Sequence, residues 1–405
     1  MIRLSFVASL LPVLLSLPVA PLAAAVPDAP PAPEEFAILP WGWTPAQKPV
    51  LDEIRSCGFN LAGFVRPEGL DAVAAAGLKC IVSDDGLHVR DDAGQIDDAE
   101  MNKRIKTLVD RIGRHPAVFG YYLRDEPSAK LFGVLAKWSD ALRGAAPHAR
   151  PYINLFPNYA NDAQMGVPSY GEYVESFIRV CKPPFVSYDH YALMDDGSLR
   201  GGYFQNLEII RRLTLKHNLP FWNIVLSNGH FRYAEPTEAG LRFQAYTTLA
   251  YGARGISYFT YFTPDGGNYR LGPIDQFGDK TATWSMLRRV NLQLHRLMPT
   301  YLTLKSVSVF HHPDVPAECA PARMAKHVDQ VSGGSFVVGE FEAPNGMPYA
   351  MIVNKSLRES AALGVKFKTP GRIVQVNTYT GRTHDYSGEN VWLAPGQGVL
   401  VGLKK

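Results

Sequence analysis

Short β-like runs alternate with helical stretches eight times between residues 36 and 304, and no other feature constrains the fold as strongly. The strand candidates are Phe36–Leu39, Asn60–Val65, Lys79–Ser83, Val118–Leu123, Pro151–Phe156, Phe185–Tyr188, Phe221–Leu226 and Gly255–Tyr261. The helical stretches lie at about 46–57, 68–76, 98–113, 128–145, 169–181, 203–217, 237–253 and 281–298. Such alternation is typical of parallel α/β folds, and eight repeats over roughly 270 residues match the usual size of a (β/α)8 barrel. We therefore predict a TIM barrel over residues 36–304.

The main alternative is a doubly wound open sheet. A dinucleotide-binding sheet of that kind carries Gly-x-Gly-x-x-Gly after its first strand. Here the first strand candidate leads into Leu39-Pro40-Trp41-Gly42-Trp43, which lacks that spacing. The barrel is therefore the preferred prediction.

The helical periodicity ends after Leu304. Alternating runs such as Ser335–Phe341 and Tyr349–Val353 follow, separated by turn sequences such as Pro344-Asn345-Gly346. This pattern predicts a small antiparallel β-sandwich over residues 305–405. We expect it to cover the barrel rather than to bind sugar.

The first 25 residues combine a basic start at Arg3, a proline-interrupted apolar run and the small residues Ala23–Ala25. This composition is typical of a secretory signal peptide, and the prolines argue against the alternative of a membrane anchor. Residues 26–35 are rich in proline and predict a linker. No later stretch is long and apolar enough to cross a bilayer. We therefore expect a secreted or periplasmic protein without a membrane span.

Charge and cysteine content exclude several classes of protein. The net charge is +3, and charged residues make up 20% of the chain without forming a basic stripe, so nucleic acid is not an expected partner. The four cysteines stand singly, which indicates neither a zinc site nor a dense disulfide framework. An oxidising compartment would permit one bridge, with Cys57–Cys80 as the candidate pair. The sequence does not specify an oligomeric state.

The fourth strand candidate ends in Tyr-Tyr-Leu-Arg-Asp-Glu-Pro at residues 121–127. In a TIM barrel the reacting groups project from the C-terminal ends of the strands. A carboxylic acid held there among aromatic side chains has its pKa raised by desolvation, as protonation of a leaving oxygen near neutral pH requires. Glu126 is therefore the candidate general acid.

At this point the chain resembles the large clan of retaining barrel glycoside hydrolases, whose acid/base glutamate closes strand four in an Asn-Glu-Pro motif. Asp125-Glu126-Pro127 matches that motif with aspartate in place of asparagine. The resemblance implies that Glu126 is the acid/base and that Asp125 occupies the position that contacts the substrate's 2-hydroxyl. Residues 241–259 also resemble the segment between helix seven and strand eight in β-galactosidase-type members. The likeness covers about residues 36–300.

The chain departs from this clan at strand seven, where the family places its nucleophilic glutamate. Residues 221–230 contain no carboxylate. Two other acids are candidates for the second catalytic carboxyl: Glu235, in the loop that follows this strand, and Asp189, at the end of strand six. We favour Glu235, because it follows the expected strand and lies between Tyr233 and Pro236, which could fix and desolvate it.

Polar and aromatic residues near the predicted strand ends are candidates for substrate binding, because aromatic rings stack on sugars. They are Trp41, Trp43, Asp84, Asp125, His190, Tyr191, Asn228, His230, Tyr258 and Tyr261.

The leading functional hypothesis is hydrolysis of a glycosidic bond in a carbohydrate substrate by two carboxyl groups, without a cofactor or metal. The separation of the two carboxyls would decide between retention and inversion. An alternative is a non-catalytic glycan-binding barrel that has lost its nucleophile. A barrel enzyme for phosphorylated or acyl substrates is disfavoured, because the chain has neither a Gly-rich phosphate loop nor a Gly-x-Ser-x-Gly elbow.

Overall fold

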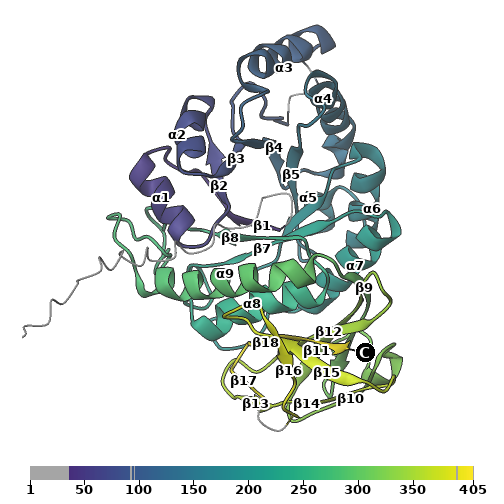
Figure 1. Ribbon diagram of the computed structural model, residues 1–405. Coiled ribbons are helices and arrows are strands. Elements are labelled where there is room, and N and C mark those ends of the chain that lie inside the picture. The colour runs from purple at the N-terminus through teal and green to yellow at the C-terminus, as the bar shows by residue number, and fades with distance from the viewer. Residues whose placement is uncertain (1–35, 92–93, 95, 389–390, 405) are drawn as a thin grey trace, which may run out of the picture. The chain divides into compact units, whose positions relative to one another are not determined.

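The computed structural model describes residues 36–404 except 92–93, 95 and 389–390. The predicted signal peptide and linker therefore lie outside the described residues. Within them, an eight-stranded parallel sheet carries the neighbour order β1-β8-β7-β6-β5-β4-β3-β2 (Figure 1). Its strands are β1 (Ala37–Pro40), β2 (Leu61–Val65), β3 (Lys79–Val82), β4 (Val118–Asp125), β5 (Pro151–Leu155), β6 (Val186–Asp189), β7 (Phe221–Leu226) and β8 (Gly255–Phe259).

The sheet closes on itself between β1 and β2. Trp43, just beyond β1, forms a parallel bridge with Phe64 of β2. The Phe64 amide donates to the Gly42 carbonyl over 3.0 Å, and the Thr44 amide donates to the Phe64 carbonyl over 2.9 Å. The predicted TIM barrel is therefore confirmed.

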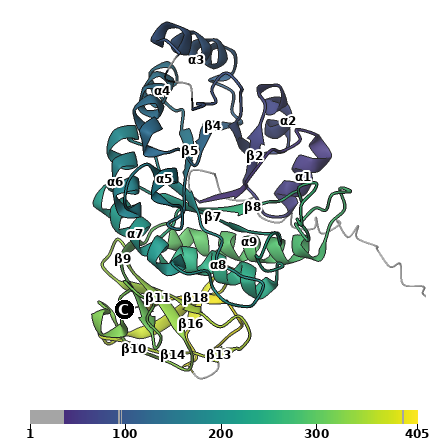
Figure 2. The same cartoon turned by 180° about the vertical axis from the view of Figure 1, so that it is seen from behind.

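Helices surround the barrel and connect its strands (Figures 1 and 2). They are α1 (Lys48–Ser56), α2 (Leu70–Ala75), α3 (Asp98–Ile112), α4 (Phe132–Ala145), α5 (Asp162–Met165), α6 (Tyr170–Cys181), α7 (Tyr203–Lys216), α8 (Glu238–Ala250) and α9 (Ala282–Tyr301), with short 3-10 turns at Pro67–Gly69, Ala129–Leu131 and Ala322–Met324. Side chains cap several of them; the Thr237 hydroxyl, for example, accepts from the Gly240 amide at the start of α8 over 3.0 Å.

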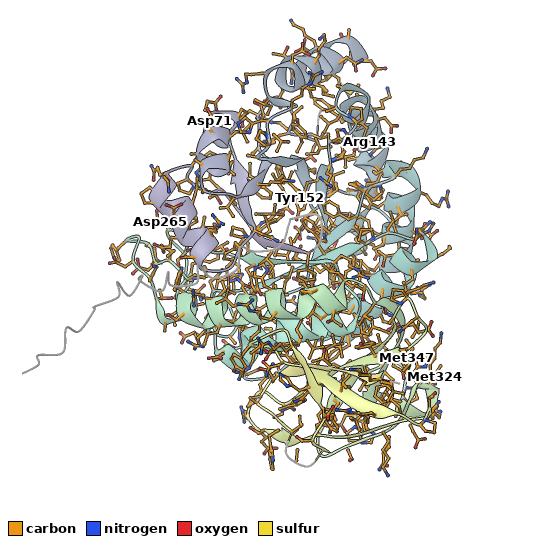
Figure 3. The ribbon with its side chains drawn as sticks, in the orientation of Figure 1. Asp71, Arg143, Tyr152, Asp265, Met324 and Met347 are labelled. Atoms are coloured by element: carbon orange, nitrogen blue, oxygen red, sulfur yellow. The ribbon has the colours of Figure 1, made fainter. Side chains whose placement is uncertain are left out.

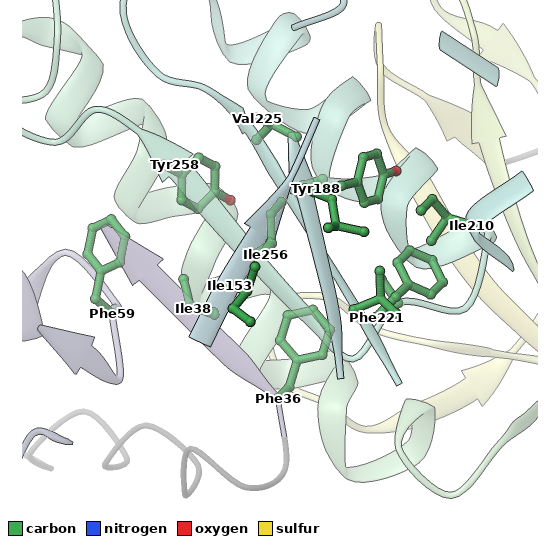
Figure 4. Packing of buried hydrophobic residues seen from close by; sticks show 14 of the residues in the cluster. Phe36, Ile38, Phe59, Ile153, Tyr188, Ile210, Phe221, Val225, Ile256 and Tyr258 are labelled. Carbon is green, nitrogen blue, oxygen red and sulfur yellow. The ribbon is translucent and has the colours of Figure 1, made fainter. Parts of the chain in front are cut away.

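The strands alternate their side chains between two apolar layers, as the period of two in a strand requires. Inside the barrel, rings from neighbouring strands fill the interior; Tyr152 lies at its centre (Figure 3) and Trp222 stacks on Phe185. Outside, residues such as Tyr188 and Tyr258 face the helices (Figure 4). The filled interior leaves the strand ends as the place for a site.

The C-terminal part is antiparallel. Its six-stranded sheet has the order β16-β15-β18-β12-β11-β9, and two-stranded ribbons β10-β14 and β13-β17 accompany it. The strands are β9 (Lys305–His312), β10 (Val328–Ser332), β11 (Phe336–Glu342), β12 (Pro348–Asn354), β13 (Ala361–Ala362), β14 (Gly364–Phe367), β15 (Arg372–Val376), β16 (Thr383–Asp385), β17 (Trp392–Leu393) and β18 (Gly398–Lys404). The predicted β-sandwich is confirmed.

Helix α8 packs directly against β11 and β12 of this sheet. Gly339 of β11 permits the close approach, since a Cβ there would lie 1.9 Å from the Ala250 carbonyl oxygen. Val337 and Met351 share one apolar cluster with the barrel's outer layer. The sandwich therefore supports the helix that follows the β7 loop.

The cysteines Cys57, Cys80, Cys181 and Cys319 are all free thiols, so the candidate bridge Cys57–Cys80 is wrong. Both residues are fully buried, and burial raises the pKa of the Cys80 thiol to about 12. They belong to the apolar layer around the barrel. None of the described helices is both long and apolar enough to span a membrane.

Candidate active site

A cavity of about 270 Å³ opens at the C-terminal ends of the barrel strands. Three acids, one asparagine and a set of aromatic rings line it: Trp41, Asp125, Glu126, Asn154, Tyr159, Asp189, Tyr191, His230, Phe231, Tyr233 and Phe259. These residues come from the ends of β1, β4, β5, β6, β7 and β8 or from the loops that follow. This is the position at which TIM barrels place their chemistry.

Glu126 stands directly after β4 in an unusual backbone conformation. Its φ is +43°, in the left-handed region that residues other than glycine seldom adopt. The Glu126 amide donates to the Asn154 carbonyl on β5 over 2.8 Å, which holds the conformation. Backbone strain of this kind persists where the surroundings enforce it, often at active sites. The sharp turn brings the Glu126 side chain to the cavity.

Asn154 connects the acids of β4 and β6. Its Nδ2 donates to Asp125 Oδ1 over 3.1 Å and to Asp189 Oδ1 over 2.9 Å. Its Oδ1 accepts from the Ser187 hydroxyl over 3.0 Å, and Ser187 in turn contacts the Tyr152 hydroxyl. Because Ser187 occupies the amide oxygen, the amide nitrogen faces the two carboxylates. The interior of the barrel thus orients the site.

All three acids have raised pKa values. The surrounding protein and the charge of Asp125 raise the pKa of Glu126 from 4.5 to about 7. Burial, with the charges of Glu126 and Asp125, raises the pKa of Asp189 well above its ordinary value. The pKa of Asp125 is also raised by the protein around it, although its side chain is accessible from the open cavity. Neighbouring carboxyls that repel one another share protons over a wide pH range.

Hydrogen bonds distinguish Asp189 from Glu126. The Asn154 amide donates to Asp189 and counteracts part of its pKa increase. For Glu126, burial and the charge of Asp125 both act against ionisation. A hydrogen bond to the charged form favours ionisation, so the Asn154 contact favours a charge on Asp189, whereas burial and the neighbouring charges favour its protonated form.

Aromatic rings form the remaining wall of the cavity. Tyr191 stacks on Phe259, with ring centroids 5.6 Å apart. Trp41 packs edge-on against Phe64 of β2, with centroids 4.6 Å apart. His230 stacks on Tyr269 at 4.8 Å, and its pKa is lowered to about 4 by burial and by Arg270, so its ring is neutral near pH 7. These faces suit a ligand that carries apolar C–H surfaces.

The structure does not place Glu235 among the residues that line the cavity. Its carboxylate accepts from Arg270 Nε over 2.7 Å, and its side chain is 54% exposed. The expectation that this acid folds back into the mouth is therefore wrong: Arg270, from the segment between β8 and α9, holds it on the rim. Asp189, the other candidate, lies in the cavity and is buried.

Several predicted substrate-binding residues lie elsewhere. Tyr258 contacts Phe59 in the layer beneath the helices (Figure 4), and Tyr261 also contacts Phe59. Phe259, between the two tyrosines in sequence, lines the cavity instead. Asp84 lines a separate cavity beside α3. These placements correct the expectation that the three residues face the mouth.

Three further candidates stand near the cavity without lining it. Trp43 is exposed on the rim, where Arg66 lies over its ring at 5.7 Å. His190 is fully buried behind the cavity between Tyr159 and Tyr203. The Asn228 Oδ1 contacts His230 Nδ1 over 2.9 Å, so Asn228 positions a ring that does line the cavity. Asp125, Tyr191, His230 and Trp41 are at the cavity as expected.

Sequence reasoning missed Asn154, Phe231 and Phe259 as site residues. The parity of β5 could have found Asn154, because it stands two residues after the inward-facing Tyr152. The same parity applies to Phe259, two residues after Ser257 on β8. Phe231 lies on an irregular loop, where periodicity gives no signal.

No group of histidine, cysteine, aspartate and glutamate residues in the described part of the chain is arranged to hold a metal ion. The acidic pairs Asp84-Asp85 and Asp195-Asp196 instead engage nearby arginines: Asp85 pairs with Arg66 at 2.8 Å and Asp195 with Arg232 at 3.2 Å.

The structure is similar to solved glycoside hydrolases. A β-galactosidase from Bacillus circulans sp. alkalophilus aligns with a TM-score of 0.60 and 8% identity over 91% of this chain and 99% of that one. A family 5 glycoside hydrolase from Bacteroides vulgatus ATCC 8482 aligns with a TM-score of 0.58 and 12% identity over 91% and 89%. At sequence identities of 8% and 12% this similarity establishes the fold alone. The activity has to be inferred from the residues of the site.

A further match is the β-galactosidase from the psychrophilic Marinomonas ef1, with 12% identity and a TM-score of 0.49. It covers 68% of this chain, which spans only 63% of that one. No protein-family model matches the sequence, and no curated protein matches it. The predicted resemblance to barrel glycoside hydrolases is confirmed at the level of the fold by the two structures with the higher TM-scores.

Proposed function

We propose that this chain is a glycoside hydrolase that cleaves an extracellular oligo- or polysaccharide, with Glu126 and Asp189 as its reacting carboxyl groups. The observation that carries the proposal is their convergence in one aromatic-lined cavity at the strand ends. Glycoside hydrolysis requires two carboxyl groups in opposite protonation states. Mutual repulsion between Glu126 and Asp189 disfavours a charge on both at once, so the pair retains one proton over a wide pH range.

Glu126 acts as the general acid. It donates its proton to the glycosidic oxygen as the bond to the anomeric carbon breaks, so the alcohol leaves neutral. A pKa of about 7 keeps the carboxyl protonated in weakly acidic solution and still acidic enough to transfer the proton. The hydrogen bond from the Glu126 amide to the Asn154 carbonyl holds the backbone from which this side chain projects.

Asp189 acts on the anomeric carbon. As a nucleophile it would form a glycosyl ester that water then hydrolyses, with overall retention; as a base it would remove a proton from an attacking water, with inversion. In this proposal Asp189, at the end of β6, takes the role of the glutamate that is missing from strand seven. Glu235, on the loop after β7, does not take that role because it is paired with Arg270. NMR detection of the first-formed anomer distinguishes the two roles.

The surroundings support a sugar as the substrate. Trp41, Tyr191 and Phe259 offer ring faces for the C–H surfaces of a pyranose, and Asp125 offers hydrogen bonds to its hydroxyls. The fold is that of glycoside hydrolases, β-galactosidases among them. The predicted signal peptide favours an extracellular substrate.

Release of reducing sugar from aryl glycosides and from plant and algal polysaccharides tests this proposal. Glu126→Gln removes the transferable proton while keeping the size of the side chain. We expect about 10²–10⁴-fold slower hydrolysis of substrates with poor leaving groups, and a smaller loss on activated aryl glycosides. An unchanged rate on a natural substrate would remove Glu126 from this role.

The alternative of a non-catalytic glycan-binding barrel has one observation in its favour. The end of β7 carries the buried Ser227 and Asn228 where the clan places its nucleophile. Binding of a glycan, with no turnover of any of the aryl glycosides or polysaccharides, would favour this alternative and contradict hydrolysis.

A further inference from the structure

We propose that Phe231 is a stacking platform for the sugar ring beyond the scissile bond, so that the site holds one ring in the cavity and the next ring on its rim. This inference rests on the proposed hydrolysis and specifies its substrate as a disaccharide or the end of an oligosaccharide. Phe231 lines the cavity but its side chain is 66% exposed. Other rings in that wall, such as Trp41 and Tyr233, are buried.

The backbone of Phe231 is held in a conformation that a large side chain disfavours. Its φ is +45°. The Asn268 side chain clamps it from both sides: the Phe231 amide donates to Asn268 Oδ1 over 2.6 Å, and Asn268 Nδ2 donates to the Phe231 carbonyl over 3.0 Å. An exposed ring kept in a strained position by a dedicated side chain indicates a functional requirement for its orientation.

The loop that carries Phe231 is fastened to the segment between β8 and α9. Gly229 and Arg270 exchange two backbone hydrogen bonds of 2.9 Å. Arg270 also binds Glu235 on the Phe231 loop. Glu235 is thus a positioning residue that ties the two segments together.

Aromatic neighbours support the ring from the side of the cavity. The centroid of Phe231 lies 5.2 Å from His230 and 6.2 Å from Tyr269, and these two stack on one another. Both contacts are tilted or edge-on, with interplanar angles of 62° and 58°. The Phe231 ring therefore extends this aromatic group to the cavity opening.

The size of the cavity limits how much of a glycan enters it. Its volume of about 270 Å³ lies below the roughly 300–1,000 Å³ typical of sites that enclose drug-sized ligands. One pyranose fits, and a second ring must lie at the opening. In this proposal the ring on the platform is the one on the leaving-group side of the bond, and cleavage proceeds from a chain end.

The test measures binding by Glu126→Gln protein, which keeps the cavity but hydrolyses slowly. The probes are matched pairs of one and two rings: galactose and β-1,4-galactobiose, glucose and cellobiose, xylose and xylobiose. For the pair that binds, we expect Phe231→Ala to weaken the disaccharide about 3- to 12-fold and leave the monosaccharide unchanged. Phe231→Tyr should restore the affinity. Asn268→Ala should weaken the disaccharide in the same direction, by releasing the clamp.

Phe277→Ala is the matched control, because Phe277 is 90% exposed in the segment between β8 and α9 and does not line the cavity. A kinetic measurement separates the Phe231 platform from the cavity that holds the first ring. Phe231→Ala should lower kcat/KM on the disaccharide. It should not lower kcat/KM on the glycosyl fluoride of the same sugar, because fluoride is too small to stack on the ring. Equal losses on both, or an unchanged disaccharide affinity, would overturn the platform and leave hydrolysis intact. Failure of every pair to bind, together with no hydrolysis of the aryl glycosides and polysaccharides, would overturn the proposed function as well.

Discussion

Replacing Glu126 with glutamine should stabilise the protein above pH 7. The carboxyl has a pKa of about 7 in the folded chain against an ordinary value of 4.5. At about 1.36 kcal/mol for each tenfold change in acidity, that difference corresponds to about 3 kcal/mol. Glu126 is partly accessible to solvent, which screens its interactions, so we expect about 1–2 kcal/mol.

The sign follows from proton binding. Between pH 4.5 and about 7 the folded chain holds the Glu126 proton more strongly than the unfolded chain does. The stability contributed by this group is therefore complete below pH 4.5 and is lost as the pH rises toward 7. Glutamine does not titrate, so the advantage of the variant should be small at pH 4 and largest near pH 8.

Urea unfolding of wild type and variant across this pH range measures the difference. Glu238→Gln is a control of opposite sign, because Arg289 lowers the pKa of Glu238. It should destabilise the protein at neutral pH. Equal or lower stability of Glu126→Gln at pH 8 would refute the placement of Glu126 in a desolvated, like-charged site.

Three further changes have defined outcomes. Asp125→Asn removes the charge that raises the pKa of Glu126, so the alkaline limb of the kcat/KM profile should move to lower pH; an unmoved limb would contradict the coupling. Asn154→Ala removes the donor to Asp189 and should lower kcat about 10- to 100-fold in a folded protein, as circular dichroism can check. Glu340→Gln in the sandwich should lower the free energy of urea unfolding by about 3 kcal/mol or more. The reason is that the buried Glu340 carboxylate accepts hydrogen bonds from the amides of residues 326–328. A smaller loss would show that water replaces the lost carboxylate oxygen.

The regular part of the fold could be predicted from the sequence because its signals are local. The strand predicted at Phe221–Leu226 is β7 without adjustment, and the helix predicted at about 98–113 is α3 at Asp98–Ile112. Apolar runs between turn residues fix such elements. The parallel order and the closure follow from the eight repeats.

The site could be predicted less completely, because it depends on parity and on loops. Sequence alone located Glu126 and Asp189 at strand ends, but it did not reveal that Phe259, rather than Tyr258, lines the cavity. Glu235 does not line the cavity, because its carboxylate accepts a hydrogen bond from Arg270, 35 residues later. Long-range ion pairs of this kind leave no periodic signal in the sequence.

The central claim is that Glu126 and Asp189 are the reacting pair, and a comparison of Asp189→Ala with Glu235→Ala tests it most directly. Both variants are assayed for kcat/KM on the same hydrolysed glycoside. We expect Asp189→Ala to lose at least about 10²–10⁴-fold, because it removes the group that acts on the anomeric carbon. Glu235→Ala should keep activity within about tenfold, because it breaks an exposed ion pair. Normal hydrolysis by Asp189→Ala, with an inactive Glu235→Ala that azide restores as a glycosyl azide, would contradict the account.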